Sequence, residues 1–153
     1  MLQALSAQRR DIRLNWEALL RLERPSSPLA NPDTLVHLLD RSLEEIFRDL
    51  ALWSSRAHPH AYAPQCPCGL NPWLAYLDAG RQALRAALID VQVATPGLSH
   101  AARDEALACL EQVLDHIARR EIESFCAVCQ SRPRAHRQTS PAGPAHHAHQ
   151  AHP

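Results

Sequence analysis

Prolines divide this chain into four segments in which apolar residues recur at the spacing of an α-helix. The segments are 2–23, 32–53, 72–94 and 99–130, and proline-containing stretches lie between them. Proline in a helix interior removes a hydrogen bond and clashes with the preceding turn, so each of these stretches should end one helix before the next begins. The spacing therefore predicts four helices.

The second segment shows the helical pattern most clearly. Its large apolar side chains follow one another at steps of four or three residues and form one stripe, with charged residues outside it. They are Leu35, Leu39, Leu43, Ile46, Leu50 and Trp53. Asn31 and Pro32 supply an N-cap and a first helical residue for this segment, and Asn71 and Pro72 do the same for the third. Ser99 is the expected N-cap of the fourth.

Four helices joined by mostly short connections favour an all-α fold, an antiparallel up-down-up-down four-helix bundle. A chain of 153 residues with 46% apolar residues can bury one core, and we expect residues 1–131 to form this single domain. Residues 54–69, with three prolines, make an unusually long connection between the second and third helices. Residues 132–153 are rich in Pro, Ala and His and carry no large apolar side chain, so they should form a disordered C-terminal tail.

Two pairs of cysteines stand far apart in the chain. Cys66 and Cys68 belong to the long connection, and Cys126 and Cys129 lie near the end of the fourth helix. In an up-down-up-down bundle these two places share one end of the molecule. Residues i and i+3 lie on one helix face, so Cys126 and Cys129 can point to one centre. Four thiolates in a tetrahedron form a closed structural zinc site, and we therefore expect these four residues to bind Zn²⁺.

Other interpretations of these thiols stay open. They could be reduced and without a metal, form a reversible disulfide or redox pair, or hold an Fe–S cluster. His58 or His60 could replace one thiolate, and Trp73 and Tyr76, close to the long connection, could cover a metal site. The fifth cysteine, Cys109, lies among apolar residues of the fourth helix and should be a core residue.

Charge and hydropathy argue against two classes of partner. The 16 basic residues are matched by 16 acidic ones, so no net field favours nucleic acid or an anionic membrane. No apolar run approaches the roughly 20 residues that span a bilayer. Because no signal peptide is recognisable, five cysteines fit metal or redox chemistry better than a disulfide framework, and we expect a soluble cytoplasmic protein.

The sequence also lacks the patterns of common enzymes. No Glu has a His three residues later, as carboxylate-bridged di-iron sites require, and four glycines form no phosphate-binding motif. His37 and His116 lie among charged residues and are expected on the surface. We therefore expect a non-catalytic regulatory or protein-interaction module with structural zinc, which binds a protein partner and could form a homodimer. The alternative is a redox or metal sensor, in which the cysteines hold labile zinc, a disulfide switch or an Fe–S cluster.

Overall fold

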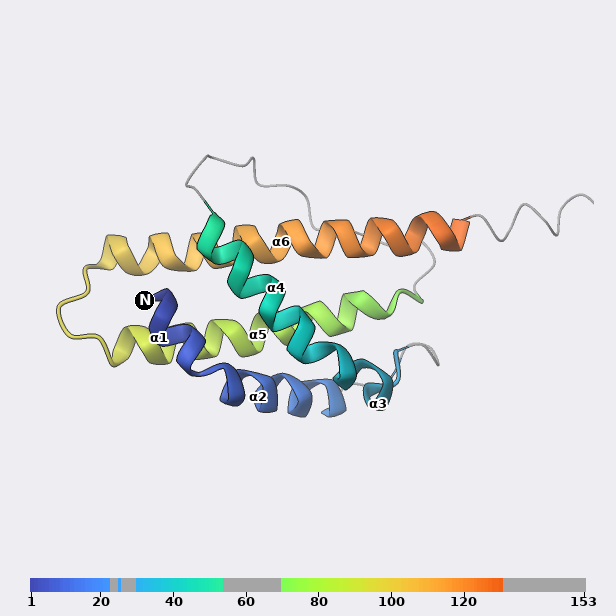
Figure 1. Cartoon of the computed structure of the whole chain (residues 1–153), viewed down its shortest axis with the longest axis horizontal. Helices are drawn as coiled ribbons and strands as arrows, with labels where there is room; N and C mark the ends of the chain where they lie inside the picture. Colours follow the sequence, from blue (N-terminus) through green and yellow to red (C-terminus); the bar gives the residue numbers. More distant parts are fainter. Residues whose placement is uncertain (23–24, 26–29, 54–69, 131–153) are drawn as a thin grey trace, which may run out of the picture.

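The computed structural model describes residues 1–22, 25, 30–53 and 70–130, and every regular element in these ranges is helical (Figure 1). The elements are α1 (Leu2–Ala7), α2 (Arg9–Leu22), α3 (Pro32–Leu35), a 3-10 turn (Val36–Leu38), α4 (Leu39–Leu52), α5 (Pro72–Val93) and α6 (His100–Gln130). The all-α prediction is confirmed for this part of the chain. The long connection 54–69 and the tail 132–153 lie outside the described residues, so the prediction of a disordered tail stays a prediction.

Local signals set the starts of three helices. The predicted caps Asn31, Asn71 and Ser99 each accept a hydrogen bond from the backbone N–H two or three residues later, at 3.0–3.2 Å. Each bond satisfies a donor of the first helical turn that has no acceptor within its own helix. As a result, the observed starts of α3, α5 and α6 agree with those expected from the sequence.

The first two predicted helices are interrupted. Gln8 separates α1 from α2, so α1 turns away from the α2 axis and packs against α4 and α5 (Figure 1). The second helix begins with α3 and the 3-10 turn before α4 continues it. The apolar stripe nevertheless crosses both interruptions, since Leu5 and Ile12 are buried, as are Leu35 and Leu39. Apolar spacing therefore predicts which residues form the core without revealing where the helix axis bends.

The last two helices, α5 and α6, run antiparallel. At one end, the Asn71 side chain donates from Nδ2 to the carbonyl oxygen of Ile122 at 3.4 Å. At the other end, Gln92 Nε2 donates to the carbonyl oxygen of Arg103 at 3.0 Å. The first turn of α5 therefore lies beside the last turns of α6, on the right of Figure 1.

The direction of α4 differs from the predicted alternation. Arg120 of α6 pairs with Glu45 of α4, and Trp53 Nε1 donates to Gln112 Oε1 at 3.2 Å, so α4 also runs antiparallel to α6. Consequently α4 and α5 share one direction, and the order is up, down, down, up rather than up-down-up-down (Figure 1). Sixteen connecting residues can span roughly 50 Å, while the 22 residues of α5 rise only about 33 Å. The prediction was wrong because so long a connection does not force its two helices to alternate.

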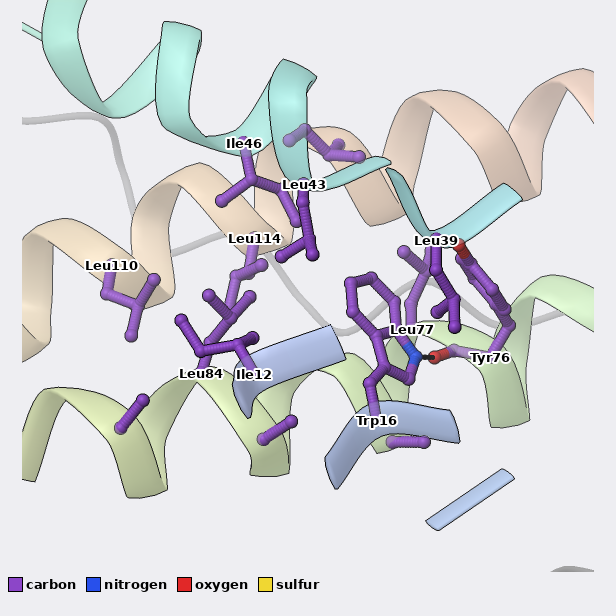
Figure 2. Packing of buried hydrophobic residues seen from close by; sticks show 14 of the residues in the cluster. Ile12, Trp16, Leu39, Leu43, Ile46, Tyr76, Leu77, Leu84, Leu110 and Leu114 are labelled. Atoms are coloured by element: carbon purple, nitrogen blue, oxygen red, sulfur yellow. Dashed lines mark hydrogen bonds between the residues drawn. The ribbon is translucent and has the colours of Figure 1, made fainter. Parts of the chain in front are cut away.

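The contact between Trp16 of α2 and Gly80 of α5 lies at the centre of the core. A Cβ atom at Gly80 would lie 2.3 Å from Trp16 Cζ2, so only glycine leaves room for the indole ring. Trp16 is fully buried, and its Nε1 donates to the Tyr76 carbonyl oxygen at 2.8 Å (Figure 2). Burial raises the pKa of Tyr76 to about 12, and its protonated phenol donates to Ser42 Oγ at 2.9 Å. One aromatic pair thus connects α2, α4 and α5.

We expect Gly80→Ala to lower the free energy of unfolding by about 1–3 kcal/mol, because the added methyl group overlaps the indole ring. This cost opposes the gain of up to about 1 kcal/mol that alanine normally brings to a helix interior. Chemical denaturation followed by circular dichroism measures it. In a Trp16→Phe background the ring atoms that collide are gone, so the same substitution should cost less. If Gly80→Ala stabilised the unaltered protein and the Trp16→Phe variant equally, the result would contradict this packing.

Candidate functional site

The end of the bundle where α5 begins and α6 ends is organised by one buried amide. Asn71 is only 2% exposed, and its Oδ1 caps α5 by accepting from the Trp73 N–H at 3.0 Å. Its Nδ2 donates to the Ile122 carbonyl oxygen at 3.4 Å and approaches Cys126 Sγ at 3.9 Å. The same side chain therefore starts one helix and holds it against the last turns of another.

Two of the four predicted zinc ligands lie at this end. Cys126 and Cys129 stand three residues apart in the last turns of α6, and both are half-buried. Cys126 also packs against the hydrophobic core. Because residues i and i+3 share one face of a helix, the two thiols belong to the same side of α6. The contact between Asn71 and Cys126 shows that this side faces the start of α5.

The other two predicted ligands, Cys66 and Cys68, lie outside the described residues, as do the alternative ligands His58 and His60. Whether their side chains approach α6 therefore stays a prediction. Within residues 1–22, 30–53 and 70–130, no group of three or more His, Cys, Asp or Glu side chains is arranged to hold a metal ion. A four-cysteine site requires the pair from the connection.

The aromatic residues near this end differ in their roles. Tyr76 has no exposed surface and belongs to the core, and its possible role in covering a metal site stays a prediction. Trp73 lies edge-on to Tyr76, with ring centroids 5.3 Å apart, and is half-buried. Together with Leu77 it lines a cavity of about 140 Å³ between α4, α5 and α6, which Glu45 and Glu121 border. Trp73 therefore packs against the core on one side and borders this cavity on another.

Oppositely charged side chains form ion pairs beside the cavity. Arg120 forms ion pairs with Glu45 of α4 and Glu121 of α6. These contacts hold α4 against α6, and the three groups together keep a net charge of −1. Such pairs at a partly exposed surface contribute little to stability, on the order of 0–1 kcal/mol each.

The remaining residues singled out in the sequence lie elsewhere. His37 is exposed, as predicted, and exposed His116 also packs its ring against Trp53, with centroids 5.9 Å apart. Cys109 is half-buried rather than fully buried, so its assignment to the core holds only in part. It lies on the wall of a second cavity near α1.

Sequence reasoning identified Asn71 as a cap but missed its role between helices. The same motif occurs at Asn31 and Pro32, yet Asn31 is exposed, and its side chain caps α3 by accepting from the Asp33 N–H. The Asn-Pro pair is the same at both positions, so the motif alone does not reveal which asparagine is buried. One indication of this role was present in the sequence. Cys126 was expected at the end of the bundle where the third helix begins, and two helix ends that share a metal site must also be held together.

Replacing each asparagine by aspartate tests this difference. Aspartate keeps the oxygen that caps the helix, so Asn31→Asp should change the free energy of unfolding by less than about 0.5 kcal/mol. Asn71→Asp loses the Nδ2 donor and buries a carboxylate beside the Ile122 carbonyl, so it should destabilise the fold by about 2–4 kcal/mol at pH 7. Urea denaturation measures both. Equal effects at the two positions would show that Asn71 acts only as a cap.

Comparison of the chain with protein families, with curated proteins and with solved structures gives no match. Among the helices that the structure describes, none has the length and apolarity required to cross a bilayer. Any function must therefore be inferred from the side chains themselves. Asn71, Cys126 and Cys129 supply the strongest constraint on it.

Proposed function

We propose that this chain is a non-catalytic helical module that binds a protein partner, with its fold closed by a structural zinc ion on Cys66, Cys68, Cys126 and Cys129. The observation that carries the proposal is the 3.9 Å approach of Asn71 Nδ2 to Cys126 Sγ. It supports the proposal because Asn71 directly follows the long connection that contains the other two cysteines. A metal there would attach residues 54–69 to the end of α6.

Covalent geometry limits how far the two cysteine pairs can be from each other. Cys68 precedes Asn71 by three residues, so its Cα atom lies within about 11 Å of the Asn71 Cα atom. The corresponding limit for Cys66, five residues before Asn71, is about 18 Å. Since Asn71 contacts Cys126, the connection can bring both thiols to α6 without any change in the described helices.

The surroundings of Cys126 suit a metal-bound thiolate in two respects. A zinc ion with four thiolate ligands carries a net charge of about −2, and N–H groups that point to the sulfur atoms stabilise such a site. Asn71 Nδ2 is one such donor, and the N-terminal end of α5 supplies a positive dipole end nearby. The C-terminal end of α6 acts in the opposite direction. Half-burial of Cys126 and Cys129 shields part of each sulfur atom from water.

The alternative function is a redox or metal sensor that uses the same cysteines. The partial exposure of Cys126 and Cys129 favours it, because oxidants or a competing chelator can reach half-buried sulfur atoms. In this case the zinc would be labile, or the cysteines would form disulfides or hold an Fe–S cluster. Both functions use the same four cysteines as ligands. The identity of the metal and how readily it is released therefore decide between the two functions.

Metal content and absorption spectrum test the proposal directly. The full-length protein should be purified without oxygen and without a polyhistidine tag, because a tag would add further histidines to those of the tail, and histidine-rich segments can bind metals adventitiously. We expect one zinc ion per chain and no visible absorption. Visible charge-transfer bands would support an Fe–S cluster. A metal-free protein that a chelator does not destabilise would contradict every metal-binding function.

Single substitutions identify the ligands. We expect Cys68→Ser and Cys126→Ser each to remove most of the bound zinc and to lower the melting temperature, because zinc binding stabilises only the folded state. Cys109→Ser is the matched control, since Cys109 lies on the same helix but lines a separate cavity. It should retain the metal. Loss of zinc from Cys109→Ser, with zinc retained in Cys126→Ser, would show that the ligand assignment is wrong.

A further inference from the structure

A second cavity lies at the other end of the bundle from Asn71 and Cys126. It has a volume of about 110 Å³ and lies between α1, α4, α5 and α6. Cys109, on its wall, precedes Cys126 by seventeen residues on α6, which corresponds to about 25 Å along the helix axis. The cavity is therefore independent of the candidate zinc site.

Three sides of this cavity are hydrocarbon. Met1, Leu2 and Leu5 line it from the N-terminal segment, and Leu50 of α4 and Leu88 of α5 lie across from them. Leu5 and Leu88 are almost fully buried and belong to the core, whereas Met1 and Leu2 are 40% and 36% exposed. The cavity therefore has an apolar floor in the core and an entrance beside the partly exposed side chains of Met1 and Leu2.

The fourth side is formed by α6. Ala106, Cys109 and Leu110 line the cavity, and Leu110 points from α6 into the bundle interior (Figure 2). The small side chain of Ala106 leaves space that a leucine would fill. Burial raises the pKa of the Cys109 thiol, and the Glu105 carboxylate acts in the same direction, so the thiol is uncharged at neutral pH. None of the lining side chains carries a charge or a strong hydrogen-bonding group.

We propose that this cavity binds a small apolar molecule, or the apolar end of a larger one, of about the size of a single six-membered ring. The size follows from the volume, since an apolar cavity of about 150 Å³ in another protein stays dry and binds benzene. The chemistry follows from the lining, because a polar ligand would lose its hydrogen bonds to water without finding replacements. Partly exposed Met1 and Leu2 provide a route of entry that does not require the helices to separate.

Benzene is a suitable probe for the full-length protein. In methyl-detected NMR titrations we expect saturable shifts confined to residues of the cavity wall, and a higher melting temperature in the presence of benzene. Phenol, which has nearly the same shape but carries a hydroxyl group, should bind several-fold more weakly. Benzene should also slow the alkylation of Cys109 several-fold, measured by mass spectrometry, without changing the alkylation of other cysteines.

Two substitutions on α6 provide the matched comparison. Ala106→Leu fills the cavity, so it should abolish the benzene-induced shifts while keeping or raising thermal stability. Ala108→Leu adds the same atoms on the exposed face of α6 and should bind benzene as the unaltered protein does. If Ala106→Leu fails to fold, Cys109→Leu serves the same purpose. Absence of saturable binding to the unaltered protein, or equal binding by the cavity-filling and surface variants, would overturn the inference.

Discussion

The close packing of Trp16 against Gly80 is the interaction on which the rest of the bundle depends. It allows α2 to approach α5 more closely than any side chain at position 80 would permit, and it fixes how far the two helices slide along each other. Tyr76, whose ring lies tilted against Trp16 with centroids 4.9 Å apart, extends this contact to Ser42 and hence to α4. Because α5 also packs along α6, its fixed position determines which part of α6 the first turn of α5 meets.

That position explains why the candidate site lies where it does. With α5 held by Trp16 at one face, Asn71 reaches the Ile122 carbonyl and the Cys126 sulfur atom on α6. Ion pairs between Arg81 and the carboxylates of Glu111 and Asp115 hold the same two helices together nearer their middle. The candidate site and the core are therefore not separate features, since α5, which packs against Trp16, also holds Asn71 against α6.

Much of the fold could be predicted because its signals are local. A cap such as Ser99 and a proline such as Pro72 act within one turn, so the starts of α6 and α5 follow from a few residues. The direction of α4 could not be predicted, because it depends on the path of residues 54–69 rather than on the helix itself. The interruption at Gln8 was missed for a related reason: apolar residues on both sides of it keep the same periodicity.

The candidate site was predicted only in part. Helical spacing placed Cys126 and Cys129 on one face, and antiparallel packing of the last two helices put them near the start of α5, which is what the site needs. The incorrect direction of α4 does not affect this neighbourhood. The two cavities could not be predicted, since a cavity is the space left after side chains have packed. The position of Cys109 on a cavity wall is a property of that packing, not of its neighbours in sequence.

Zinc K-edge X-ray absorption of the untagged protein tests most directly the claim that the two cysteine pairs meet at one metal ion. We predict a single shell of four sulfur atoms at about 2.3 Å from zinc, with no lighter ligand. A shell that contains nitrogen or oxygen atoms at about 2.0–2.1 Å would contradict the four-cysteine site and indicate histidine or water in place of a thiolate. Only the all-sulfur result is compatible with Cys66, Cys68, Cys126 and Cys129 acting together.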